Sequence, residues 1–329
     1  MLYDPRSIYV REAGCSPWGA QRPARSQAER RRVMKPGTLR KNVGSEGLGP
    51  SDAPVSHTIE SKSHMTWKRQ MLAGPTFLVI AHPGHELCLH KWGSEALPRL
   101  VVLTTGSRSG DGRERLDACL SQCEGRGVVA TDMIGEFPDR ELYRLIMQGK
   151  GDRLSAWSAR VRSMLVSQQA ARVVVDAWQG YSVAHDLTHL LTQLAVAEAE
   201  LELDTPIELL EFSPVPAAKW PRRAKTPVCV DVRLSAQEAA TKLGDACSIP
   251  ELRSEIEGLG IADSPYLLDQ ELLYVCSRDW GNDSWLNTPY YEAAGAQRVA
   301  AGIYATSLTR AHFRSVAEPL IARINALRA

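Results

Sequence analysis

The sequence lacks several features that would assign it to a class of protein directly. Its 329 residues contain no run near the roughly 18 consecutive apolar residues of a membrane-spanning helix, so we expect no membrane span. The 39 basic and 38 acidic side chains leave a formal net charge of +1, which gives no reason to expect nucleic acid as a partner. Glycine-rich phosphate-binding motifs are also missing, which weakens nucleotide binding as a function.

Paired cysteines are missing too. The seven cysteines are scattered and odd in number, and only Cys119 and Cys123 lie close together. Neither a disulfide framework nor a Cys-x-x-Cys metal site follows from this spacing. Because scattered cysteines behave as small core residues, we expect reduced, buried thiols and a cytoplasmic protein.

The first 70 residues have little hydrophobic periodicity and an uneven charge. They carry 13 of the basic and 6 of the acidic residues, and they are rich in Ser, Gly and Pro. Such a segment cannot bury enough apolar surface to offset the entropy of ordering. We therefore interpret residues 1–70 as a disordered basic leader. An alternative is an over-long gene start, with the natural chain beginning at Met65 or Met71.

From residue 76 onward, short apolar runs alternate with helical patterns. We expect strands at 77–81, 100–103, 128–130, 173–176, 207–212 and 228–234, and helices at 86–97, 113–125, 142–147, 156–168 and 185–203. This alternation predicts an α/β domain over 71–329, with a mostly parallel sheet covered by helices on both faces. We expect residues 213–329 to form a C-terminal α/β extension of it. In such sheets, ligands bind at the carboxyl ends of the strands.

Two histidine-bearing loops follow predicted strands. His82 and His85 flank Pro83 and Gly84 where the first strand ends, and His185 opens the helix after the fourth strand. Three imidazoles plus a water molecule form an accepted catalytic zinc arrangement. The pattern therefore predicts a zinc site of His82, His85 and His185. His90 and His189 can instead be helix-surface residues, an interpretation that we favour for His90, whereas His189 can share a face with His185.

Several neighbouring residues are candidates for other roles. Glu86 and Asp186 stand beside the histidines and can accept a proton, although Asp186 can equally cap a helix or orient a ligand. Asp111 lies in a Gly- and Ser-rich loop that can approach a polar substrate or form an ordinary turn. Tyr181 is among the aromatic residues that can stack on a sugar ring or fill a core.

At this point the chain resembles a known family. Ala81-His82-Pro83-Gly84-His85-Glu86 is similar to the first motif of the LmbE/PIG-L-type zinc-dependent N-deacetylases, usually Ala-His-Pro-Asp-Asp-Glu after a strand. Residues 102–107, followed by Arg113 and Arg115, resemble the second strand and the Arg-bearing helix of that family. The loop ending in His185 is similar in position to its later His-x-x-His motif. The resemblance covers about residues 76–210.

The resemblance implies a Rossmann-like sheet that holds zinc through His, Asp and His, with a neighbouring Asp as general base. By position, His82 and His185 match ligands, His85 stands where the family has its ligand Asp, and Gly84 stands where it has its base. Ser182 matches the place of a His that polarises the substrate. Imidazole in place of a carboxylate keeps a zinc site chemically feasible, but glycine removes a proton acceptor.

These observations predict a zinc-dependent hydrolase of N-acyl groups whose substrate is an N-acetylated sugar or a related amide. The alternative is a catalytically impaired relative that binds a sugar or protein partner without turnover. A third interpretation is an assembly role for the tail from residue 289, forming a homo-oligomer. The predicted site comprises the metal ligands His82, His85 and His185, the proton acceptors Glu86 and Asp186, and the substrate contacts Asp111, Arg113, Tyr181 and Ser182.

Overall fold

The computed structural model describes residues 74–106, 113–215, 227–259, 268–276 and 288–329. The described strands are β1 (Thr76–Ile80), β2 (Arg99–Thr104), β3 (Val129–Phe137), β4 (Arg172–Asp176), β5 (Glu208–Phe212), β6 (Val228–Arg233) and β7 (Gln270–Val275). The described helices are η2 (His85–Leu89), α2 (His90–Ala96), α3 (Arg113–Gly125), α4 (Asp139–Met147), α5 (Gly151–Ser167), α6 (Val183–Leu203), α7 (Ala236–Ser248), α8 (Pro250–Leu259), α10 (Tyr290–Ala300) and α11 (Arg310–Arg328).

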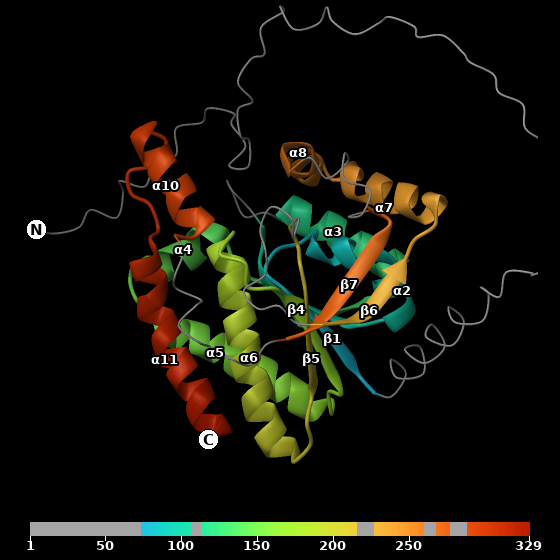
Figure 1. Cartoon of the computed structure of the whole chain (residues 1–329), viewed down its shortest axis with the longest axis horizontal. Coiled ribbons are helices and arrows are strands. Elements are labelled where there is room, and N and C mark those ends of the chain that lie inside the picture. Colours follow the sequence, from blue (N-terminus) through green and yellow to red (C-terminus); the bar gives the residue numbers. More distant parts are fainter. Residues whose placement is uncertain (1–73, 107–112, 216–226, 260–267, 277–287) are drawn as a thin grey trace, which may run out of the picture.

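The described strands form one sheet in the order β3-β2-β1-β4-β5-β7-β6 (Figure 1). The first five run parallel, and β7 pairs antiparallel with both β5 and β6. The chain order reverses between β1 and β4, which are direct neighbours. Loops leaving these two strands diverge to opposite sides and open a crevice at their carboxyl ends. The predicted α/β class with a mostly parallel sheet is therefore confirmed.

Helices cover both faces of the sheet (Figure 1). On one face, α4, α5, α6 and α11 enclose a core that includes Leu142, Trp157, Leu190 and Phe313. On the other face, α2 and α3 pack on the sheet through Trp92 and Cys123, among other residues. Residues 183–199 of α6 are all buried, because the sheet, α5 and α11 surround this helix. Histidines on α6 are consequently interior residues, so the expectation that His189 lies on a helix surface is wrong.

The segment after β1 also differs from the prediction. We expected one helix over 86–97, but the chain forms the 3₁₀ helix η2 and then restarts as α2. The carboxylate of Glu271, which lies in β7, accepts hydrogen bonds from the backbone N–H groups of Lys91 and Trp92. This distant carboxylate takes the place of a cap at the start of α2, which local sequence does not reveal.

The cysteines are only partly as expected. Among the described cysteines none forms a disulfide, and Cys119, Cys123 and Cys276 are buried, but Cys229 is exposed on β6. The predicted leader, residues 1–70, lies outside the described residues. Within the part of the chain that is described, no helix is long and apolar enough to cross a membrane.

Candidate metal and substrate site

The two predicted histidine loops meet at the crevice between β1 and β4. The ring centroids of His82 and His85 lie 5.3 Å apart, and His185 lies 5.4 Å from the first and 4.6 Å from the second. His82 lies two residues after the end of β1, His85 is the first residue of η2, and His185 lies in the first turn of α6. Rings bound to one tetrahedral zinc through nitrogens at about 2.0–2.1 Å would have centroids about 5 Å apart. The ring separations therefore fall in the range of such a site.

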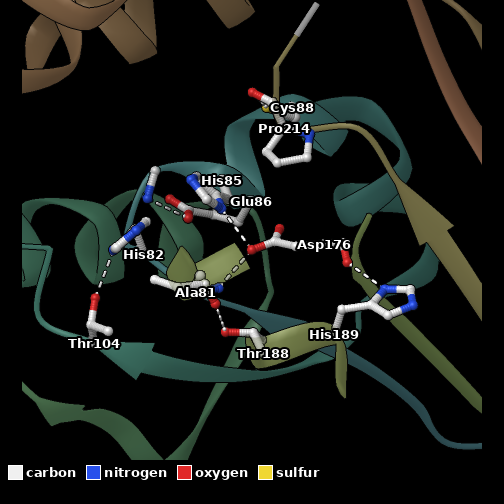
Figure 2. A network of polar contacts seen from close by, with 12 residues as sticks. Ala81, His82, His85, Glu86, Cys88, Thr104, Asp176, Thr188, His189 and Pro214 are labelled. Carbon is white, nitrogen blue, oxygen red and sulfur yellow. Dashed lines mark hydrogen bonds and ion pairs between the residues drawn. The ribbon is translucent and has the colours of Figure 1, made fainter. Parts of the chain in front are cut away.

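Two of these rings are held by hydrogen bonds to oxygen atoms. Nδ1 of His82 lies 2.7 Å from Oγ1 of Thr104, and Nδ1 of His85 lies 2.9 Å from Oδ2 of Asp176 (Figure 2). The same carboxylate oxygen of Asp176 accepts a hydrogen bond of 2.7 Å from the backbone N–H of Ala81. In metal-binding histidines, the ring nitrogen that does not bind the metal is commonly hydrogen-bonded in this way. The bond fixes the ring and leaves the other nitrogen to bind the metal.

Burial sets the protonation of the site. It lowers the pKa of His85 and of His185 well below the ordinary value, and the positive charge of the neighbouring imidazoles acts in the same direction. Burial raises the pKa of Asp176 to about 6. The two histidines are therefore neutral at pH 7, which is the form that binds a metal ion.

Unpaired polar atoms allow a test of whether a metal fits. Nδ1 of His185 and Oδ1 of Asp176 are buried without a hydrogen-bond partner among the described residues. The donor set is therefore chemically suited to zinc. However, the ring nitrogens of His82, His85 and His185 do not already lie close together as a set of three metal ligands. The group of three potential ligand atoms within 4.8 Å of one another in the described residues is a different one: His189, Glu211 and Cys276.

The three pocket histidines line a cavity of about 470 Å³, a volume typical of small-molecule sites. One wall carries polar and aromatic side chains, and Tyr181 stacks on Tyr290 of α10 with the ring centroids 5.0 Å apart. Another wall is apolar and includes Leu252 and Ile256 of α8. Residues beyond 213 therefore form part of the same cavity as the histidine loops.

The two predicted proton acceptors do not line this cavity. Oε2 of Glu86 accepts a hydrogen bond of 2.7 Å from the backbone N–H of Gly84, which stabilises the turn. Oδ1 of Asp186 accepts hydrogen bonds from the backbone N–H groups of Gln179 and Gly180, at 3.0 and 3.1 Å. Both carboxylates hold the loops that carry the histidines, and neither is among the residues that face the cavity.

The predicted substrate contacts divide into three groups. Tyr181 and Ser182 line the cavity. Arg113 is exposed at the start of α3 and does not line it. Asp111 lies outside the described residues.

Arg115, which belongs to the same family-like helix as Arg113, lines the cavity in its place. Its guanidinium donates to the carbonyl oxygen of Pro83 at 2.8 and 3.0 Å and pairs with Glu255 of α8.

Sequence reasoning missed two carboxylates. Asp176 is the last residue of β4, and Asp139 follows β3, lines the cavity and lies 3.3 Å from Nδ1 of His82. Both stand at carboxyl ends of parallel strands, which was the signal that could have found them.

Gly84 stands where the resembling family has its base, and a side chain there would overlap with a side chain of α8. Its φ of +103° disfavours any residue with a Cβ, and a Cβ would lie 2.6 Å from Cδ2 of Leu252. Leu252 belongs to α8, which contacts the turn from the C-terminal part of the chain. The space that a carboxylate would need at position 84 is therefore occupied by an apolar side chain.

A scan against protein-family models finds no match, and neither does a search of curated proteins. Among solved structures, the chain is similar to the A40926 pseudoaglycone deacetylase Dbv21, with a TM-score of 0.42 and 14% identity over 61% of this chain and 99% of that one. It is also similar to a zinc-inhibited form of the teicoplanin deacetylase Orf2, with a TM-score of 0.40 and 12% identity over 62% and 99%. These proteins are deacetylases, the class that the sequence resemblance implies.

Proposed function

We propose that this chain is a metal-dependent hydrolase that removes an N-acyl group, such as N-acetyl, from a sugar or related small molecule. The observation that carries the proposal is the meeting of three largely buried histidine rings, 4.6 to 5.4 Å apart, in the lining of a cavity sized for a small molecule. Two of the rings already have their Nδ1 atoms held by Thr104 and Asp176.

His82, His85 and His185 would hold the metal. A zinc ion bound there would supply a water molecule that ionises near neutral pH. Asp139 is the carboxylate that lines the cavity beside His82, so we assign it the role of proton acceptor in place of Glu86 and Asp186. Asp176 keeps the ring of His85 oriented through its 2.9 Å hydrogen bond. Tyr181 and Ser182 contact the substrate.

Metal content and turnover test the proposal together. We expect the purified chain to bind about one equivalent of zinc in this cavity and to release the acyl group from at least one member of a panel of N-acetylated sugars and simple amides. The variant His185→Ala should lose both properties. His90→Ala is the matched control, because His90 pairs with Asp245 on the outside of the cavity and does not line it. Unchanged metal content in His82→Ala, His85→Ala and His185→Ala would overturn the proposal.

One observation favours a second function, binding without turnover. Where the resembling family has its general base, this chain has Gly84, and the side chain of Leu252 lies where a Cβ would need space. In that case N-acetylated sugars would bind in calorimetry, Tyr181→Ala would weaken the binding, and Asp139→Asn would leave it unchanged. Turnover that is lost in Asp139→Asn would exclude this second function.

A further inference from the structure

A second cluster of potential metal ligands lies apart from the cavity. His189 of α6, Glu211 of β5 and Cys276, which follows β7, each offer one ligand atom, and these atoms lie within 4.8 Å of one another. The three residues are 0%, 4% and 3% exposed. None of them lines the cavity. The cluster is therefore enclosed, whereas the pocket histidines face a space that can hold a substrate.

The ring of His189 is oriented as a metal-binding imidazole would be. Its Nδ1 lies 2.9 Å from the backbone carbonyl oxygen of Asp176, so Nδ1 carries the proton and donates it (Figure 2). Nε2 then carries the lone pair that can bind a metal ion or accept a hydrogen bond, and it lies 3.6 Å from Sγ of Cys276. A nitrogen and a thiolate sulfur on one tetrahedral zinc, at about 2.0–2.1 and 2.3 Å from it, are about 3.6 Å apart. The observed separation thus matches that of two ligands of a single ion.

The third ligand comes from the neighbouring strand. One carboxylate oxygen of Glu211 lies within 4.8 Å of the ligand atoms of His189 and Cys276. Imidazole, thiolate and carboxylate together suit zinc better than magnesium or calcium, which prefer oxygen atoms alone. Because the three residues come from α6, β5 and the end of β7, a shared ion would join these three elements.

Gln193 contacts the same two atoms and provides the competing explanation. Its Nε2 lies 2.9 Å from Nε2 of His189 and 3.5 Å from Sγ of Cys276, while its Oε1 accepts from Arg328 at 3.3 Å. An amide at this place can satisfy the imidazole and the thiol by hydrogen bonds without an ion. The two arrangements differ in one respect that can be measured, since only the ion requires the thiolate form of Cys276.

We propose that His189, Glu211 and Cys276 bind a divalent zinc-like ion in a closed site that fastens β7 to α6 and β5. Binding takes one proton from the thiol of Cys276 and releases it to solvent, and the imidazole and carboxylate bind without further change. The site does not depend on the proposed hydrolase function. We assign it a structural role because its three residues are nearly fully buried and line no part of the cavity.

Cobalt substitution tests the site through its sulfur ligand. The full-length chain is freed of metal with a chelator and titrated with Co²⁺. A thiolate ligand produces a near-ultraviolet charge-transfer band that nitrogen and oxygen ligands do not produce. We expect this band in the wild-type chain and in His82→Ala, in which the pocket site is impaired. It should disappear in Cys276→Ser, which changes one atom and keeps the volume of the side chain.

Cys88→Ser is the matched control, because Cys88 lines the cavity near the pocket histidines and is the thiol that a pocket-bound ion could reach. The band should persist in this variant. X-ray absorption of the zinc-loaded wild type should show one sulfur neighbour at about 2.3 Å. A folded wild-type chain without the band, or a band that is lost in Cys88→Ser and kept in Cys276→Ser, overturns the proposal. The former outcome leaves Gln193 as the partner of both atoms.

Discussion

Asp176 illustrates how one residue serves two neighbouring clusters. Its side chain holds His85 and the backbone of Ala81, and its carbonyl oxygen accepts from His189 on α6 (Figure 2). Asp176 is the last residue of β4. Its side chain reaches His85 in the cavity, and its backbone carbonyl reaches His189 in the second cluster. The geometry of both clusters consequently depends on the register of a single strand end.

The variant Asp176→Asn should weaken zinc binding in the cavity by about 10–100-fold, the usual effect of removing the carboxylate partner of a metal-binding histidine. Competition with a chelating dye measures this affinity. Asp152→Asn, on the exposed first turn of α5, is the control and should leave the affinity unchanged. Equal affinities in the wild type and both variants would show that Asp176 does not orient a metal ligand.

The three pocket histidines could be predicted because each lies next to a strand end in the sequence. The roles of Glu86 and Asp186 could not, because the direction of each side chain depends on local geometry. Glu86 sits in η2, where a 3₁₀ turn points it back toward Gly84, and Asp186 faces the loop of residues 177–181 from the first turn of α6. Adjacency in sequence therefore predicted which histidines come together, but it did not predict which carboxylate lines the cavity beside them.

At the scale of elements, the turn at Gly84 and the helix α8 constrain each other. Leu252 fills the space above the glycine, with Cδ1 and Cδ2 at 2.7 and 2.6 Å from the place of a Cβ. This contact joins the first loop of the domain to a helix about 170 residues later in the chain, a separation at which sequence patterns say nothing about packing. The prediction of a C-terminal extension therefore did not reveal that this extension contacts the site.

A double-mutant cycle measures this constraint. Gly84→Ala should lower the free energy of unfolding, since a positive φ alone costs a residue with a Cβ about 1–2 kcal/mol and the overlap with Leu252 adds to it. In a Leu252→Ala background only the backbone part remains, so we expect a coupling energy of about 0.5–3 kcal/mol from urea unfolding. The same cycle with Ile256→Ala should be additive within about 0.5 kcal/mol. Additivity in both cycles would contradict the contact.

At the scale of the whole molecule, buried ionisable groups should make stability depend on pH. In the folded chain the pKa values of His85 and His185 lie well below the ordinary value. Below about pH 6.5 the unfolded chain therefore binds more protons at these groups, and stability falls as the pH drops. Asp176 acts in the opposite direction. Its pKa is raised to about 6, so between that pH and its ordinary value the folded chain binds the extra proton.

Unfolding by urea at about pH 7.5 and about pH 5.5, with a chelator present, tests this balance. We expect the metal-free wild type to be less stable at the lower pH. In His185→Gln this loss should be smaller by about 1.4 kcal/mol, the equivalent of one proton over one pH unit. In Asp176→Asn the loss should be larger, because the opposing group is gone. An identical pH response in all three chains would contradict the assigned shifts.

The contact between Gly84 and Leu252 also limits the routes by which such a chain can change over generations. A carboxylate at position 84 requires Leu252 to move or to be replaced, because a Cβ there would lie 2.6 Å from its Cδ2. A smaller residue at position 252 removes this overlap but leaves a void, and the φ of +103° still disfavours any residue with a Cβ. Acquisition of a base at this turn is thus favoured by a paired change at positions 84 and 252 over a single one.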